Sequence, residues 1–248
     1  MCVFTITGEL FDLGPIMATP IIRQLLPKYS ESADGIVTSP RYCKVGTLGG
    51  HSVCELLAVL TTQMRNRDWI TAMHQERVCA LSIALAKELH LADREITGIA
   101  VAAMLHDVGK AVLPAEILHK VGKLTARETS LMNSHPENGA ELLREVSFPW
   151  PVKEAILQHH ERQDGSGYPQ GLTDDEICVG ARIIGVADVV EAMASDRPYR
   201  SALPLACVAE HIASSECYDR KVAEACVALY ERGELARYVE RPHHLQAS

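Results

Sequence analysis

The sequence has 248 residues, 47% of them hydrophobic, and a formal net charge of −8. This length allows one substantial core with at most a small appendage, and the negative charge excludes a broad positive surface for polymeric DNA or RNA. An anionic ligand would have to be held by local positive charge such as metal ions. No apolar run approaches the roughly 20 residues of a membrane-spanning helix, and the N-terminal MCVFTITGELFD is acidic where a secretory signal is basic. We therefore expect a cytoplasmic protein without a membrane segment.

The chain divides by composition into three parts. Residues 1–50 contain scattered Gly and Pro, an alternating VFTIT start and the loop-like stretch YSESADGIVTSP, which predicts a short irregular N-terminal appendage. Residues 51–240 are expected to form the main domain. Residues 241–248 are expected to be a C-terminal tail, where order is least expected.

The first half of the main domain predicts amphipathic helices. Apolar residues recur at spacings of three and four over 51–68 and again over 71–90. The apolar face of the first of these helices would pack either on its own domain or on a second copy of the chain. Asp93 is the expected N-cap of a third helix, which leads through an apolar segment into His106 and Asp107 and ends near Gly109.

The second half continues this pattern. Two helices are expected on either side of His135-Pro136, because proline disfavours helix in the residue before it. Thr125 and Glu128 have the spacing of a capping box. Further helices are predicted over 151–160, 177–195 and within 204–233. Since strand patterns are nearly absent, the sequence predicts an all-α domain whose site residues project from facing helices.

Histidine and aspartate side chains recur in these separate segments, at His74, His106, Asp107, His135, His159, His160 and Asp188. A single histidine on a helix usually has a structural role. Asp188, however, lies within the apolar IIGVADVVEAM, where an unpaired carboxylate would be costly. Imidazole and carboxylate ligands suit first-row divalent metals, and a carboxylate can bridge two ions. The set predicts a two-metal centre that supplies hydroxide for attack on a phosphoryl group near neutral pH.

The motifs around these residues resemble the HD-GYP family, a branch of the HD phosphohydrolase superfamily. They are His74-xx-Arg77, His106-Asp107-x-Gly109-Lys110, GKLT at 122–125, His135-Pro136, HHERQDGSGYP at 159–169 and VADVVEAMASDRPYR at 186–200. The resemblance covers about residues 55–232, and the long HHExxDGxGYP match is its most specific part. It implies a helical bundle around a buried metal centre.

The resemblance also implies an activity. Members of the family are metal-dependent phosphodiesterases in which a metal-bridging hydroxide opens cyclic di-GMP to linear pGpG, and some continue to GMP. The seven His and Asp residues match the family's ligand positions, with Asp107 as the expected bridge. Ile70 stands where some members have a glutamate for a third metal, so we expect two ions. Iron or manganese is favoured, with zinc, nickel or cobalt as alternatives.

The resemblance assigns further roles around the ligands. Lys110 matches a lysine near the phosphate, where its charge would stabilise the transition state. Arg197 and Arg200 match basic positions that approach the substrate phosphates. Gly167 and Tyr168 belong to a loop that lies at the substrate site in the family and contacts partner proteins, for which a diguanylate cyclase is an example.

Three residues of the motifs keep two interpretations each. Glu161 and Asp164 are predicted either to brace the loop or to form hydrogen bonds behind the ligands, not to bind metal themselves. Arg77 would either orient its helix through a contact with a carboxylate or form an ordinary surface salt bridge.

Two alternatives to the leading function stay open. The first is a catalytically weak module that binds a cyclic dinucleotide or a partner protein. The second is a phosphodiesterase for another cyclic dinucleotide such as cyclic GMP-AMP. The complete ligand set together with Lys110 favours catalysis, because a binding module has no chemical need for all of these groups. A homodimer is also compatible with the sequence.

Overall fold

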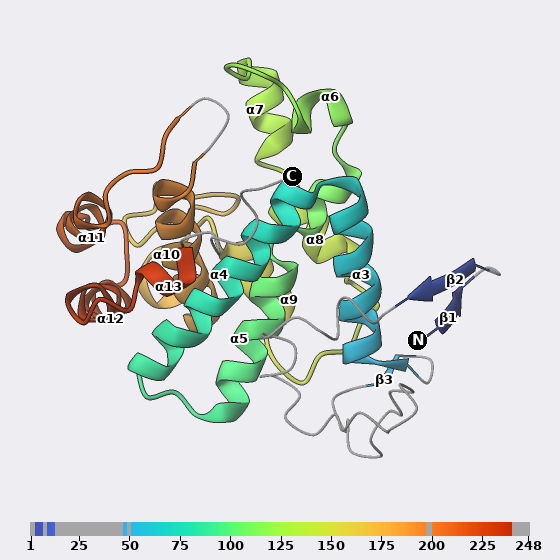
Figure 1. Cartoon of the computed structure of the whole chain (residues 1–248), viewed down its shortest axis with the longest axis horizontal. Coiled ribbons are helices and arrows are strands. Elements are labelled where there is room, and N and C mark those ends of the chain that lie inside the picture. Colours follow the sequence, from blue (N-terminus) through green and yellow to red (C-terminus); the bar gives the residue numbers. More distant parts are fainter. Residues whose placement is uncertain (1–2, 7–8, 13–46, 49–50, 197–199, 240–248) are drawn as a thin grey trace, which may run out of the picture.

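The computed structural model describes residues 3–6, 9–12, 47–48, 51–196 and 200–239. Short strands come first and form two antiparallel pairs: β1 (Val3–Ile6) with β2 (Glu9–Asp12), and β3 (Thr47–Leu48) with β4 (His51–Ser52). Most of the expected appendage lies outside the described residues. From Val53 onward the described chain is helical, which confirms the all-α prediction for the main domain (Figure 1).

The helices follow one another closely along the chain. They are α3 (Val53–Arg67), α4 (Trp69–Glu88), α5 (Asp93–Leu105), α6 (Ala115–Leu118), α7 (Ala126–Met132), α8 (His135–Leu142), α9 (Val152–Gln158), α10 (Val179–Ala194), α11 (Leu205–Ser214), α12 (Arg220–Glu231) and α13 (Ala236–Val239). Two 3-10 helices, η1 (Val108–Val112) and η2 (Asp174–Glu176), connect them. Among the described residues, no helix has the length and apolar character needed to cross a bilayer.

The core lies where α4 packs against α5 and α10. Leu81 and Leu85 of α4, Ala103 of α5 and Ile183 of α10 are fully buried in it, and the small side chains of α5 allow its backbone to approach α4. Helix α9 packs on α5 and α10, and α8 packs on α9 and η1. The helices that carry the predicted ligands are therefore the helices that share the core.

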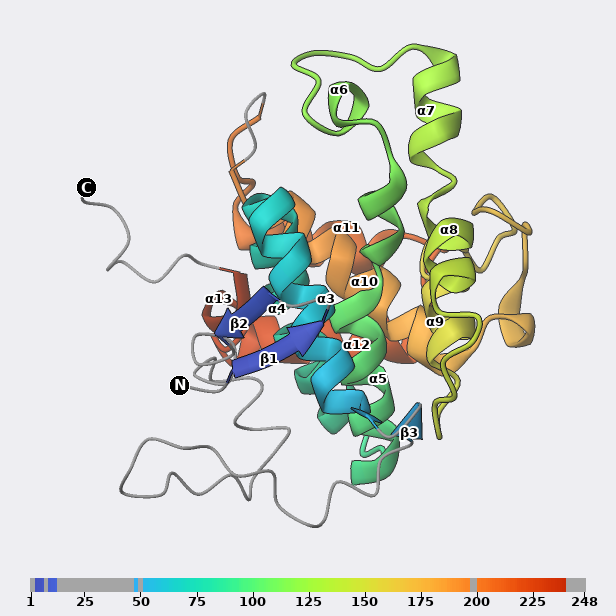
Figure 2. The same ribbon diagram turned by 90° about the vertical axis from the view of Figure 1, so that its right-hand side faces the viewer.

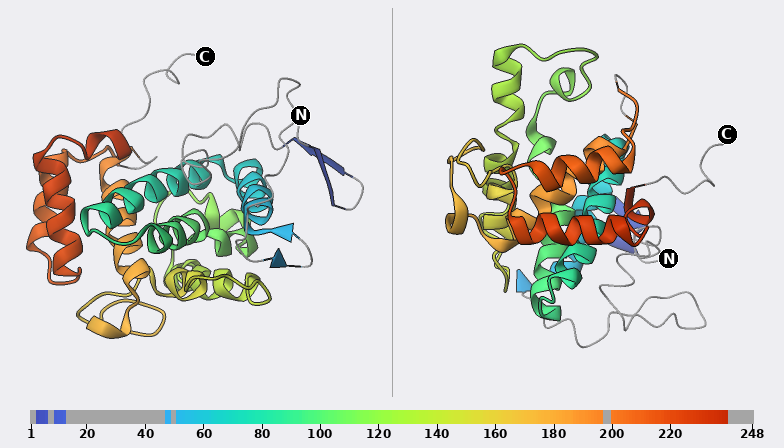
Figure 3. Two further views of the ribbon diagram at one scale, coloured as in Figure 1. Left: turned by 90° about the horizontal axis from the view of Figure 1, so that it is seen from below. Right: turned by 90° about the vertical axis from the view of Figure 1, so that its left-hand side faces the viewer.

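The remaining helices surround this centre. Helix α3 packs on α4 and α5, with Ala58 and Met64 buried, so its apolar face is used within the domain. Helices α11 and α12 pack side by side at one end of the body (Figure 3). Helices α6 and α7 project beyond the other helices and contain no buried residue (Figure 2).

Local capping explains where the predicted helices begin. The Asp68 carboxylate accepts the backbone N–H groups of Ile70 and Thr71, both at 3.1 Å, so α4 starts at Trp69, two residues earlier than expected. The predicted capping box is confirmed, because the Glu128 carboxylate accepts the N–H of Thr125 at 2.7 Å. The expected break between two helices is present, but it lies at Asn133 and Ser134, because His135 and Pro136 already belong to the first turn of α8, where proline is tolerated.

Two predictions about α5 are wrong. Ala92, not Asp93, is the N-cap, because the Glu95 carboxylate satisfies the backbone N–H of Ala92 and Asp93 is already helical. At the other end, Gly109 does not terminate the helix. Helix α5 ends at Leu105, and Gly109 lies in η1, where a Cβ atom would come 2.0 Å from the His135 carbonyl oxygen. The glycine therefore lets η1 pack tightly on α8.

Candidate metal centre

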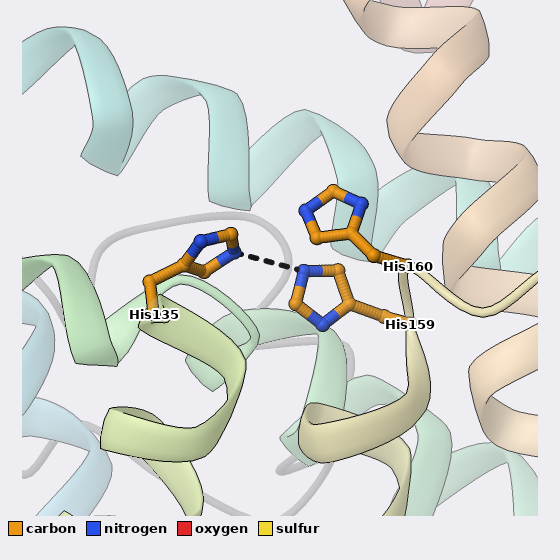
Figure 4. A group of neighbouring side chains, drawn as sticks. All are labelled: His135, His159 and His160. Carbon is orange, nitrogen blue, oxygen red and sulfur yellow. Dashed lines mark hydrogen bonds between the residues drawn. The ribbon is translucent and has the colours of Figure 1, made fainter. Parts of the chain in front are cut away.

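The structure brings all seven predicted ligand residues into one cluster, which we call the metal cluster. His74 comes from α4, His106 follows α5, Asp107 precedes η1, His135 begins α8, His159 and His160 follow α9, and Asp188 lies within α10. Potential ligand atoms gather within 4.8 Å of one another in three groups: His74, His106 and Asp188; His106, Asp107 and His159; and His135, His159 and His160. Figure 4 shows the last group, with its rings turned toward a common point.

Asp107 lies between the two sides of this cluster. Its Oδ1 atom is 3.3 Å from His135 Nε2, and its Oδ2 atom is 3.5 Å from His106 Nε2 and 3.9 Å from His74 Nε2. Its side chain is almost completely buried. A carboxylate whose two oxygens face different histidines has the arrangement required to bridge two cations.

Asp188 closes the cluster from the α10 side. Its Oδ1 atom lies 3.0 Å from His74 Nε2, and its Oδ2 atom lies 3.9 Å from His160 Nδ1. The carboxylate that the sequence places in an apolar helix is thus surrounded by imidazoles. The polar contacts remove the cost of burying it.

Three of the histidines are oriented by backbone carbonyls at the C-terminal ends of helices. The Nδ1 atoms of His106, His135 and His159 each donate to the carbonyl three residues earlier, at 2.6 to 2.7 Å. Carbonyls in the last turn of a helix have no partner within the helix and are free to accept such bonds. The protons are therefore held on Nδ1, and each Nε2 atom is left as a lone-pair donor that faces the cluster.

Burial keeps most of these imidazoles neutral. It lowers the pKa of His135 to about 4 and that of His160 to about 3, and it holds the pKa of His159 well below its usual value. His74 behaves differently. Although burial lowers its pKa, hydrogen bonds to Asp188 and Glu191 outweigh that effect and raise the pKa to about 9. A metal ion requires the neutral form of a histidine ligand, so the cluster is largely in the form that binds metal.

The two carboxylates of the cluster are ionised. Burial disfavours the charged form of Asp107, but Lys110 and the surrounding histidines hold its pKa well below the usual range. In the same way, the hydrogen bond from His74 outweighs burial and keeps the pKa of Asp188 low. The cluster therefore combines neutral imidazoles with two buried negative charges, which are ligands for divalent cations.

Three imidazole nitrogen atoms within the cluster have no hydrogen-bond donor to satisfy them. The buried Nε2 atom of His106 has no hydrogen-bond partner. The Nε2 atoms of His135 and His159 face each other at 3.2 Å (Figure 4), yet both rings already donate their proton from Nδ1, so neither neutral ring can donate to the other. Because cations would satisfy all three lone pairs, the donor set fits the metal centre that the motifs imply.

The residues predicted to act on substrate lie around the cluster. Lys110 Nζ is 2.6 Å from Asp107 Oδ2 and remains partly exposed. The Tyr168 ring stacks on His160 with 4.8 Å between centroids. Arg200 donates to the Ala192 and Met193 carbonyls at the end of α10, so its described hydrogen bonds do not reach the cluster. Arg197 lies outside the described residues.

The loop that follows His160 is braced by its own residues. The buried Glu161 carboxylate accepts the N–H groups of Gln170 and Leu172, at 2.6 and 3.0 Å. Asp164 caps the turn at Ser166. A Cβ atom at Gly167 would lie 2.4 Å from Glu161 Cα, so only glycine fits where the loop packs back against Glu161. These contacts favour the bracing interpretation of Glu161 and Asp164, and they position Tyr168.

One residue of the site was missed by reasoning from the sequence. Glu191 of α10 is 1% exposed and forms hydrogen bonds with His74 Nδ1 and the Arg77 guanidinium. Arg77 therefore contacts a buried carboxylate, which is the first of its two interpretations. The signal was present, because Glu191 follows Asp188 by three residues in the same apolar helix and its burial carries the same cost.

Comparison with known proteins agrees with this geometry. A family model for the HD domain matches residues 59–222. A cyclic di-GMP phosphodiesterase of Pseudomonas aeruginosa is 41% identical over 182 residues, which cover 71% of this chain and 44% of the relative. A 3'3'-cGAMP-specific phosphodiesterase of Vibrio cholerae is 40% identical over 148 residues, which cover 59% of this chain and 28% of the relative. The chain thus spans less than half the length of these curated relatives.

The fold has solved counterparts as well. The crystal structure of a cyclic GMP-AMP-specific phosphodiesterase of Vibrio cholerae superposes with a TM-score of 0.57 at 18% identity, covering 75% of this chain and 50% of the other. At this identity the likeness shows the fold alone. The family model, the curated relatives and the conjunction of the motifs in one buried cluster lead to the same conclusion. The chain belongs to the HD domain family, as its motifs predict.

Proposed function

We propose that the protein is a metal-dependent phosphodiesterase that hydrolyses cyclic di-GMP to linear pGpG. The observation that carries this proposal is the metal cluster, in which the two oxygens of buried Asp107 face histidines on opposite sides. The curated relatives named as cyclic di-GMP phosphodiesterases support the choice of substrate. Turnover to GMP would be a second cleavage of the same kind.

We infer that the cluster would hold two divalent ions. His74, His106 and Asp188 would hold one, and His135, His159 and His160 would hold the other, with Asp107 between them. Bound ions of this kind lower the pKa of a water molecule and neutralise charge on a phosphoryl group. Five imidazoles and two carboxylates accept several first-row metals. From the family resemblance we propose iron or manganese.

The chain's own residues would position the reacting groups. Lys110 lies at the exposed edge of the cluster, where its ammonium can approach the phosphate and stabilise the negative charge that develops as the P–O3′ bond breaks. The attacking water gives up a proton to solvent as its oxygen becomes bonded to phosphorus, and the 3′ oxygen leaves and takes up a proton from solvent. Because His106 and Asp107 are almost fully buried, bulk water would be excluded from one side of the reacting phosphate.

Tyr168, Gly167, Arg197 and Arg200 are proposed to bind the substrate. The Tyr168 ring forms a partly exposed wall next to His160, which suits contact with the sugar or base beside the cleaved phosphate. Gly167 would act through the loop backbone. The described contacts of Arg200 hold it at the end of α10, so engagement of a phosphate by this residue would require its side chain to exchange partners.

Hydrolysis of cyclic di-GMP by protein purified without oxygen, with its metal content measured, tests the proposal. We expect pGpG from the wild type and none from a His106→Ala/Asp107→Ala double variant. A Glu116→Ala/His119→Ala double variant, altered on exposed residues of the projecting α6 region, should keep full activity. A metal-loaded wild type that binds the nucleotide but releases no product would overturn the proposal.

The same assay should include 3'3'-cGAMP. A relative 40% identical to this chain is named as specific for that nucleotide, and the ligands act on the phosphate rather than on the base. The ratio of kcat/KM for the two nucleotides would decide between the substrates. A kcat/KM at least tenfold higher for 3'3'-cGAMP corresponds to about 1.4 kcal/mol in transition-state binding. In that case 3'3'-cGAMP, and not cyclic di-GMP, would be the preferred substrate.

A further inference from the structure

His74 is held differently from the histidines at the helix ends. His106, His135 and His159 donate from Nδ1 to the carbonyl three residues earlier. His74 lies inside α4, where the preceding carbonyls are already engaged in helical hydrogen bonds. It therefore needs a partner from another element, and its Nδ1 atom meets the Glu191 carboxylate of α10.

The Glu191 carboxylate is itself fixed from two further directions. Its Oε2 atom faces His74, while Oε1 accepts hydrogen bonds from the Arg77 guanidinium and from Ser195 Oγ, the latter at 2.8 Å. Arg77 lies three residues after His74 on the same face of α4. A buried carboxylate is tolerated when a cation and hydrogen bonds satisfy it, and here all of its partners also fix the direction of the carboxylate.

We propose that Glu191 is the positioning residue of the metal centre: it holds the proton of His74 on Nδ1, directs Nε2 toward Asp188, and thereby strengthens the metal position that includes His74. A carboxylate behind a histidine ligand fixes the ring and raises its basicity. Carbonyl partners orient the rings of His106, His135 and His159 without contributing a full negative charge. The proposal rests on the metal centre of the proposed function, but it does not depend on which nucleotide is cleaved.

Binding of Co²⁺ to the metal-free 248-residue chain tests this role without any substrate. Glu191→Gln keeps the size of the side chain but removes its charge. We expect the folded variant to bind Co²⁺ about 10- to 100-fold more weakly at one of two positions, with a changed visible absorption of that ion. The other position should keep the wild-type dissociation constant. Wild-type affinity at both positions would overturn the proposal.

Asp219→Asn is the matched control. Asp219 forms a half-buried ion pair with Arg182 of α10 at 2.9 Å and also caps α12, so the variant weakens a carboxylate contact on the same helix away from the metal cluster. It should lower thermal stability without changing Co²⁺ affinity. If Glu191→Gln weakens both metal positions alike and in step with its loss of stability, as a purely structural role requires, the proposal also fails.

Glu191→Asp covers the case in which the glutamine variant does not fold. The aspartate keeps the charge beside Arg77, but its shorter side chain draws back from His74. We expect Co²⁺ affinity between those of the wild type and a His74→Gln variant, and wild-type affinity would reject the positioning role. A wild type that binds two Co²⁺ ions but hydrolyses no cyclic dinucleotide would refute the proposed function, while the affinity comparison would still decide the role of Glu191.

Discussion

The interior of the metal cluster and the groups at its edge are built in different ways. His106, His135 and His159 are buried, and each ring is tied to a backbone carbonyl at the C-terminal end of a helix, namely α5, α7 and α9. At the edge, Lys110 and Tyr168 are partly exposed and contact the cluster through one side chain each, Asp107 and His160 respectively. The interior is thus tied to the backbone at buried helix ends, whereas the edge groups lie on its exposed side and contact it only through side chains.

This difference separates two consequences of mutation. A change in the interior should alter metal binding and catalysis together, because the same atoms serve both. A change at the edge should alter catalysis or substrate binding and leave the metals in place. The predictions below test that separation.

Asp107→Asn is expected to have the largest effect. The variant keeps the shape of the side chain but removes the charge between the two sides of the cluster and leaves Lys110 without its partner. We expect loss of at least one metal and a fall in kcat/KM of more than about 100-fold, beyond the usual effect of residues behind the ligands. Metal analysis and steady-state kinetics measure both effects.

The control for this variant is Asp175→Asn, which makes the same chemical change in a fully exposed partner of Arg182. It should behave as the wild type. An Asp107→Asn protein that retains two metals and normal turnover would show that Asp107 does not bridge the two sides.

Lys110→Met should lower kcat by about 100- to 1,000-fold, the range seen when one preorganised charge at a transition state is removed. Methionine preserves most of the apolar length of lysine, so the packing of η1 should survive. Metal content should stay at the wild-type level, which is where this variant differs from Asp107→Asn. Loss of metal from Lys110→Met would show that the lysine is needed for metal binding, as the interior residues are. Lys123→Met, at an exposed position in the α6–α7 region, is the matched control.

Acid should destabilise the metal-free protein in part through His135. Its pKa is about 4 in the folded chain and about 6.5 when unfolded, so between these values the unfolded chain binds a proton that the folded chain does not. The free energy of unfolding should therefore fall as the pH drops from 6.5 to 4, by about 3 kcal/mol for this group. Urea unfolding of the metal-free protein across this range measures the slope.

His135→Gln should make that slope shallower, whereas His119→Gln, at an exposed position, should not. An equal slope in the wild type and the His135→Gln protein would contradict the assignment. The effect of His74 on stability has the opposite dependence on pH. Because its pKa is raised to about 9 in the folded chain, its contribution to the free energy of unfolding is complete below pH 6.5 and is lost as the pH rises through 9. The two groups can therefore be separated by the pH range in which each acts.

Much of this architecture could be predicted from the sequence because its signals are local. Apolar spacing predicts the helices, Pro136 predicts the break before α8, and the Thr125–Glu128 pair predicts the start of α7. The seven residues of the metal cluster were predicted as a set because His106 and Asp107 follow an apolar helix, because Asp188 lies within another, and because the family motifs match them. Once the helices share one core, these residues meet.

The missed features depend on contacts between distant segments. The close approach of Gly109 to His135 belongs to the packing of η1 on α8, which no local pattern contains. Glu191 and Arg77 form their contact across 114 residues of sequence. The prediction of the N-cap of α5 failed for a different reason. Ala92 has no capping side chain, and the Glu95 carboxylate accepts the hydrogen bond from its backbone N–H.

Tyr168→Ala should have the smallest effect of this series. Removing the ring deletes the wall beside His160 that is proposed to contact the sugar or base of the substrate. An aromatic contact contributes about 0.5–1.5 kcal/mol, so we expect KM to rise up to about tenfold while metal content stays unchanged. Tyr168→Phe keeps the stack and should lie close to the wild type, which separates the ring from its hydroxyl. Loss of metal in Tyr168→Ala would mean that His160 needs the ring to stay in place. Tyr168 would then belong to the interior of the metal cluster and not to its edge.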